Sequence, residues 1–200
     1  MFSNNKFILA SNSKSRFFIL RNNRLNFYQI SPTCNEGQLK KQKAYKNIPL
    51  KKIPLMLAKA KAQSISQNKK DFLVVGSDTI IEFNGKIIEK AKNIEIARKK
   101  IREFSGKKHK IYSSAVAYYN NKLVWRKTQR TVVKIRKLTK REIDSYLKLC
   151  GKNFLHSVGC YQIEKEGANI IESINGDFFN VMGFPLFPFL LFLKKFNIKK

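Results

Sequence analysis

The chain has 200 residues, 43% of them hydrophobic, which is enough for one sizeable core or for two lobes that share one sheet. Its 41 Lys and Arg residues against 13 Asp and Glu residues give a formal net charge of +28, which attracts polyanions such as nucleic acid, acidic membranes and nucleotides. The three cysteines, Cys34, Cys150 and Cys160, form no CxxC pair, which excludes a disulfide framework or a zinc site of that kind and favours a reduced, cytoplasmic setting.

In chain order, the first half is expected to hold a strand, a helix, a strand, a loop and a second helix. These fall at residues 6–11, 13–23, 25–31, 32–50 and 49–66. Ser11 or Ser13 would cap the first helix, and Pro54 places the firm start of the second helix.

The second half is expected to hold a buried strand, a hairpin, a helix, two long strands, a helix and two last strands. These fall at residues 71–77, 80–89, 94–106, 109–135, 139–150, 159–164 and 168–174. Asn84-Gly85 marks the hairpin turn, Asn120-Asn121 joins the two long strands, and a capping box opens the helix at 139–150. An apolar helix ends the chain. Helices that alternate with strands and hairpins indicate an α/β fold with a mixed sheet.

The lysines are spread along the chain and form no single basic arm, so we expect no stable complex with nucleic acid. The excess of lysine can serve function, or it can reflect the composition of an AT-rich coding sequence. The apolar C-terminal stretch at 184–196 contains two prolines and is well short of the roughly 20 residues that span a bilayer, so we expect no membrane contact.

Asp78 is the first candidate for chemistry because it follows a run of buried strand residues and is flanked by Ser77 and Thr79. The carboxyl end of a strand is where α/β sheets tend to bind ligands. The alternative is that Asp78 is a turn or capping aspartate.

Residues elsewhere supply partners suited to a metal–nucleotide site. Carboxylates bind Mg²⁺, cationic side chains bind phosphates, and a helix N-terminus binds an anion. The candidates are Glu36, Lys61, Lys90, Ser11, Ser13 and Arg16. Taken singly, the serines can be helix caps, the lysines solvated surface residues and Glu36 a loop charge.

Six stretches follow one another in an order that resembles the Maf family of nucleoside triphosphate pyrophosphatases. They read LASNSKSRFFIL, CNEG, LAKAKA, VGSDTI, IIEKAK and FSGKKH. The closing SVGCYQIEKEGANIIESINGDFFNVMGFPL is similar to the C-terminal signature of one branch of the family, so that the resemblance covers residues 6 to about 193.

The resemblance implies a single domain over residues 1–200 with a Maf-type α/β fold, in which two lobes around an elongated mixed sheet flank a central cleft. It implies hydrolysis of nucleoside triphosphates, standard or non-standard, to monophosphate and pyrophosphate with Mg²⁺ or Mn²⁺. Asp78 matches the catalytic proton acceptor, and Glu36 with Asp78 would hold the metal. The matching phosphate-binding residues are Ser11, Ser13, Arg16, Lys61 and Lys90.

The sequence departs from the family pattern at several of these positions. Ser15 stands where the family has a first arginine, and Lys14 where it has a proline. Asn35 replaces an aspartate in many members, and Ala91 replaces the proline of a Lys-Pro pair. These changes bear on substrate choice and efficiency more than on the class of reaction.

Two further interpretations remain open at this point. The chain can be a basic protein that binds nucleotides or nucleic acid in the same cleft without turnover, or a regulator of division. Pure binding would not require both Glu36 and Asp78, which favours the enzyme. A homodimer is an open alternative to a monomer.

Overall fold

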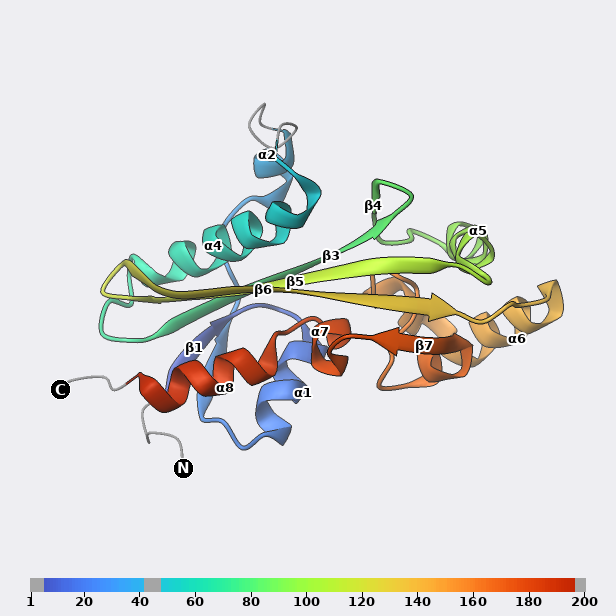
Figure 1. Ribbon diagram of the computed structural model, residues 1–200. Coiled ribbons are helices and arrows are strands. Elements are labelled where there is room, and N and C mark those ends of the chain that lie inside the picture. Colours follow the sequence, from blue (N-terminus) through green and yellow to red (C-terminus); the bar gives the residue numbers. More distant parts are fainter. Residues whose placement is uncertain (1–5, 42–47, 197–200) are drawn as a thin grey trace. The chain divides into compact units, whose positions relative to one another are not determined.

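The computed structural model describes residues 6–41 and 48–196 (Figure 1). The chain divides into two compact units, which we describe separately. Unit 1 comprises Met1–Thr79, Ser113–Gln129 and Gly183–Lys200, and unit 2 comprises Ile80–Tyr112 and Arg130–Met182. A single domain over the whole chain stays a prediction.

Unit 1 begins with the predicted strand, helix and strand. These are β1 (Phe7–Ala10), α1 (Lys14–Asn22) and β2 (Phe27–Ile30), and β1 pairs in parallel with both β2 and β3. Ser13 is the N-cap of α1, and its side chain accepts from the backbone N–H of Arg16. A short turn between β1 and α1 therefore places polar residues at the carboxyl end of a central parallel strand.

Three long strands each belong partly to both units. They are β3 (Val74–Phe83), β5 (Lys108–Tyr119) and β6 (Lys122–Ile135). The sheet has the strand order β2-β1-β3-β5-β6-β7, with β4 paired to β3. Asn120 and Asn121 join β5 to β6 with positive φ at both residues, as the predicted tight turn requires.

Helices cover both faces of the unit 1 strands (Figure 1). On one face lies α4 (Ile53–Ser66), whose Ala58 and Ala62 pack with Ile8 and Val74. On the other face lie α1 and α8 (Leu186–Lys195), and the ring of Phe189 in α8 lies 5.4 Å from that of Phe7. Both β1 and the unit 1 part of β3 are therefore buried on both faces.

Unit 2 is built on the remaining elements. They are β4 (Lys86–Ile88), α5 (Ile94–Phe104), α6 (Lys140–Cys150), β7 (Ile171–Asn175) and α7 (Phe178–Met182). Its core contains Phe104, Ile101, Ile135 and Leu147. The predicted capping box of α6 is confirmed, because Thr139 and Glu142 bond to each other's backbone N–H groups.

The predicted α/β class, a mixed sheet with helices on it, is confirmed, but four local predictions are wrong. The expected loop at 32–50 contains α2 (Glu36–Lys41) and a 3-10 turn at Leu50–Lys52, while residues 42–47 lie outside the described residues. The strand expected at 71–77 and the first arm of the hairpin are one continuous strand, β3. The last strand begins only at Ile171, after a 3-10 helix at Glu166–Ile170.

The fourth wrong prediction is the strand at 159–164. Cys160 has a φ of 60°, and the backbone N–H groups of Lys165 and Gly167 both donate to the carbonyl of Gln162. The chain turns back on itself at Gln162, so close that a Cβ on Gly167 would lie 2.4 Å from that carbonyl oxygen. An apolar run therefore forms compact turns here instead of joining the sheet.

The apolar C-terminal helix is confirmed as α8, with the short helix α7 before it. Among the described residues, no helix is long and apolar enough to span a membrane.

Candidate functional site

Asp78 was expected at the carboxyl end of a strand, and this is wrong, because it lies in the middle of β3. Its side chain is largely buried, with 11% exposed. Side chains along a strand alternate between its two faces, so Asp78 shares a face with Val74 and Gly76. That face is covered by α4, because a Cβ on Gly76 would lie 2.2 Å from the Ala58 carbonyl oxygen in this helix. The absence of a side chain at Gly76 thus allows α4 to approach the strand beside Asp78.

The close approach of α4 to β3 brings the cationic side chain of Lys61, a residue of α4, next to Asp78. Its ammonium Nζ lies 2.6 Å from Asp78 Oδ1 and 3.0 Å from Glu36 Oε1. The Lys61 side chain is only 9% exposed, whereas that of Glu36 is 42% exposed. Three predicted site residues therefore form one chain of charges, carboxylate–ammonium–carboxylate.

The segment before α2 is attached to α4, and this attachment places Glu36. The backbone N–H of Thr33 donates to Ser64 Oγ, and the Thr33 hydroxyl donates to the Ser64 carbonyl. Ser64 Oγ in turn donates to the Lys61 carbonyl. Glu36 therefore reaches Lys61 from a segment that is hydrogen-bonded to the same helix.

Two carboxylates that converge on one ammonium also suit a divalent metal, because both already direct an oxygen at a shared cation. Mg²⁺ is commonly held by one or two carboxylates, with waters and substrate phosphates as the other ligands. Within residues 6–41 and 48–196, no group of three or more His, Cys, Asp and Glu residues could hold a metal ion. Glu36 and Asp78 thus fit a metal that is bound together with its substrate better than a closed protein cage.

Arg16 is buried in the first turn of α1, with 8% of the residue exposed. Its guanidinium donates to the Gly183 carbonyl at 2.9 Å, to Thr79 Oγ1 at 3.0 Å and to Ser11 Oγ at 3.2 Å. Burial lowers the pKa of Arg16, and the negative charges of Asp78 and Glu36 oppose that effect. Hydrogen bonds within the protein therefore bring Ser11, Ser13 and Arg16 together, and their role in binding phosphate stays a prediction.

Sequence reasoning missed a polar cluster on the face of β3 that points away from Asp78. Ser77 Oγ and Thr79 Oγ1 both donate to the Gly183 carbonyl, at 3.3 and 3.2 Å. Thr79 Oγ1 also lies 2.9 Å from Ser113 Oγ in β5. The only signal in the sequence was the pair of hydroxyl residues around Asp78; Gly183, far along the chain, gave no sign of its role.

Cys34 is a second residue that the sequence did not mark. It is partly exposed and lies close enough to Glu36 and Lys61 to feel their charges. Burial, with the negative charge of Glu36, raises the pKa of the Cys34 thiol. The thiol is therefore held neutral, and it is not an activated nucleophile.

Lys90 follows β4 and belongs to unit 2, where its side chain is exposed. The segment around it is held by the buried Lys100, whose Nζ donates to the carbonyls of Glu89 and Val158. The role of Lys90 as a phosphate-binding residue stays a prediction.

Comparison with known proteins adds to this geometry. A family profile described as Maf-like protein matches residues 6–196. A 7-methyl-GTP pyrophosphatase of Bartonella henselae is 35% identical over 191 residues, which cover 96% of each chain. A nucleoside triphosphate pyrophosphatase of Caulobacter vibrioides is 33% identical over 186 residues, 93% of each chain, and one of Ruegeria pomeroyi is 33% identical over 93% of this chain and 94% of its own. The chain belongs to the Maf-like protein family.

Proposed function

We propose that this protein is a hydrolase that splits nucleoside triphosphates between the α and β phosphates and releases the monophosphate and pyrophosphate. The observation that carries the proposal is the Glu36–Lys61–Asp78 chain of charges, whose two carboxylates also act on the buried Arg16. It is supported by the pyrophosphatase names of relatives that match over almost the whole chain.

The residues of the chain have distinct tasks in this reaction. Asp78 positions the attacking water and accepts its proton as oxygen bonds to the α phosphorus, while the bond from that phosphorus to the pyrophosphate oxygen breaks. Lys61 already lies between two carboxylates, and a triphosphate gives it a third anionic partner. Ser11 and Ser13 at the start of α1 would add further phosphate contacts, and Lys90 stays a predicted phosphate-binding residue.

Glu36 and Asp78 are the residues that would hold Mg²⁺ or Mn²⁺. When bound, such a cation neutralises charge on the triphosphate and on the leaving pyrophosphate. Titration of the wild type with Mn²⁺, followed by electron paramagnetic resonance, should give a site that is strengthened by nucleotide and weakened by Glu36→Gln.

The names of the relatives guide the choice of nucleotide base to test. Some of the names specify 7-methyl-GTP, and others specify nucleoside triphosphates in general. We propose 7-methyl-GTP as the first substrate to test. We also propose that the protein is cytoplasmic and forms no stable complex with nucleic acid or membranes. It is a monomer or a homodimer.

The decisive experiment measures pyrophosphate release from standard and modified nucleoside triphosphates, including 7-methyl-GTP, with Mg²⁺ or Mn²⁺. Wild type should release pyrophosphate and no orthophosphate, and Asp78→Asn should lose about 100-fold or more of kcat. Asp71→Asn, which removes an exposed carboxylate shortly before β3, is the matched control and should behave as wild type. A wild type that binds nucleotide but releases nothing would instead support binding without turnover.

A further inference from the structure

The feature that the proposed reaction leaves unexplained is the convergence of three donors on one backbone carbonyl. Gly183 O accepts from Arg16 Nε, Ser77 Oγ and Thr79 Oγ1. All of these residues belong to unit 1. A carbonyl oxygen has two lone pairs, so these three donors share and fill its whole capacity to accept hydrogen bonds.

Gly183 itself is fixed by its surroundings. Its φ of 107° lies in the region that favours glycine, and a Cβ there would lie 3.2 Å from Thr79 Oγ1. A side chain would thus strain the backbone and press on the hydroxyl that bonds to its own carbonyl. Gly183, which precedes α8, therefore packs closely against β3, the strand that carries Asp78.

The hydroxyl of Thr79 has one proton, and its oxygen accepts from Arg16 Nη2. The same oxygen lies 3.2 Å from Gly183 O and 2.9 Å from Ser113 Oγ, and either hydroxyl can be the donor in the pair with Ser113. Thr79 therefore connects β5, α1 and the segment before α8 through one oxygen.

Ser77 and Thr79 are the two neighbours of Asp78, and they lie on the face of β3 opposite to it. Anchoring both neighbours to one carbonyl fixes the backbone of residue 78 and the direction in which its side chain leaves the strand. The contact with Lys61 fixes the same carboxylate from the other face.

We propose that Arg16, Ser77 and Thr79 form a bracket on the Gly183 carbonyl that holds Asp78 in its reactive position, so that Thr79 and Arg16 are positioning residues. This inference rests on the proposed hydrolysis. It gives Arg16 a different task from the phosphate contact that the family resemblance implies, because three of its N–H donors bond to the protein itself.

The test is Thr79→Val, which keeps the shape and removes the hydroxyl. We expect kcat for pyrophosphate release to fall about 10- to 100-fold, because small displacements of a reacting group are costly. KM, and the Kd of a non-hydrolysable α,β-methylene triphosphate, should stay within about twofold, because the bracket does not contact the substrate. Thr79→Ser keeps the hydroxyl and should restore most of kcat.

Two further variants keep the inference falsifiable if Thr79→Val folds poorly. Ser77→Ala removes one donor from the same carbonyl and should lower kcat in the same way, by a smaller factor. Arg16→Lys keeps the charge but cannot reproduce three directed hydrogen bonds, so kcat should fall with little change in Kd. Thr128→Val removes a hydroxyl that bonds to Ser114, elsewhere in unit 1, and is the matched control.

Three outcomes would overturn the bracket while the wild type is active. They are an unchanged kcat in Thr79→Val, a rise in Kd or KM in place of the loss of kcat, and an equal loss of kcat in Thr128→Val. A wild type that releases no pyrophosphate from any triphosphate would overturn the proposed function itself.

Discussion

Lys61 links the two carboxylates of the site, and its removal is the most direct test of their arrangement. In Lys61→Met the aliphatic stem remains, but Asp78 loses its partner at 2.6 Å in a largely buried position. We expect the free energy of unfolding at neutral pH to fall by about 3 kcal/mol, because an uncompensated buried charge is costly. Urea denaturation gives this value, and kcat/KM for pyrophosphate release should fall at the same time.

A surface ion pair provides the matched control for Lys61. Lys134 Nζ lies 2.7 Å from Glu172 Oε1, but both side chains are about as exposed as ordinary surface residues, at 33% and 45%. Lys134→Met should therefore cost about 1 kcal/mol or less and leave activity unchanged. Equal losses in the two variants would contradict the buried character of the Lys61 pair.

His109 is expected to make the protein sensitive to mild acid. It stacks on Phe104, and its Nε2 lies 2.6 Å from the Tyr161 hydroxyl. Nδ1 has no hydrogen-bond partner in the part of the chain that the structure describes, so a proton added there would lack an acceptor. Burial lowers the pKa of His109 from 6.5 to about 4.

The sign of the effect follows from this lowered pKa. The unfolded state binds the proton more tightly, so the contribution of His109 to stability is complete above pH 6.5 and is lost as the pH falls towards 4. We expect a loss of roughly 3 kcal/mol at most across this window. Urea midpoints measured from about pH 7.5 to 4 should show it, and His109→Phe should abolish the part of the slope above about pH 5.

Glu142 titrates at lower pH than this window, so its effect on stability can be separated from that of His109. Two Thr139 bonds and the Arg136 guanidinium lower the pKa of Glu142 to about 2, so its contribution is lost only below its usual value of 4.5. A slope that persists between about pH 6.5 and 5 in His109→Phe would show that His109 is not its source.

The sequence allowed the types of residue in the site to be predicted, but only some of the contacts between them. Glu36, Lys61 and Asp78 could be chosen because their residue types suit a metal–phosphate site and their order resembles the pattern of the Maf family. The structure joins them by ion pairs. The bracket around Gly183 could not, because a backbone carbonyl carries no mark in the sequence. Whether Lys90 serves the same site stays a prediction.

At the scale of elements, Gly76 governs how closely α4 lies on β3. A Cβ there would lie 2.2 Å from the Ala58 carbonyl and 2.8 Å from the Ala62 nitrogen, both of them backbone atoms that cannot move alone. We expect Gly76→Ala to displace α4, to destabilise the protein by about 2–3 kcal/mol and to lower activity, since Lys61 lies on that helix. Thermal unfolding and pyrophosphate release measure the two effects.

Gly85 in the hairpin turn separates this packing effect from the general cost of losing a glycine. Its φ is +75°, but no atom lies within 4 Å of the position that a Cβ would take, so Gly85→Ala should cost about 1 kcal/mol through backbone strain alone. Its activity should be that of wild type. A Gly76→Ala protein as stable and active as Gly85→Ala would show that α4 does not need the glycine.

Elements with strong local signals were predicted well, and those set by tertiary contacts were not. The Asn120-Asn121 turn and the Thr139 capping box each depend on a few neighbouring residues, and both are confirmed. The strand expected at 159–164 failed because backbone bonds to Gln162 outweigh the β-propensity of its apolar residues. The short helix at 36–41 was missed because its sequence also suits a loop.

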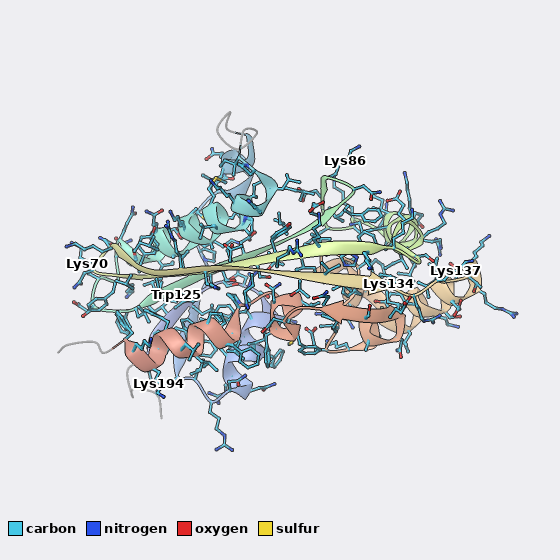
Figure 2. The ribbon with its side chains drawn as sticks, viewed as in Figure 1. Lys70, Lys86, Trp125, Lys134, Lys137 and Lys194 are labelled. Carbon is cyan, nitrogen blue, oxygen red and sulfur yellow. The ribbon has the colours of Figure 1, made fainter. Side chains whose placement is uncertain are left out.

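At the scale of the whole molecule, the formal charge of +28 can act on the substrate or on nucleic acid. The labelled lysines lie on several different elements (Figure 2), and Lys70, Lys86, Lys137 and Lys194 are all exposed. A spread of charge of this kind raises the rate of encounter with any polyanion, whereas a nucleic-acid site requires a continuous surface. The two uses respond differently to salt.

We expect electrostatic attraction of the triphosphate to be the measurable effect. Raising KCl from about 50 to 300 mM should lower kcat/KM several-fold through KM and leave kcat within about twofold, because salt screens the approach more than the chemistry. A triple variant reverses three exposed charges outside the residues of the site, by Lys70→Glu, Lys137→Glu and Lys194→Glu. In this variant kcat/KM should depend less steeply on the salt concentration. If the triple variant keeps the wild-type dependence, these three exposed lysines have no part in attracting the substrate.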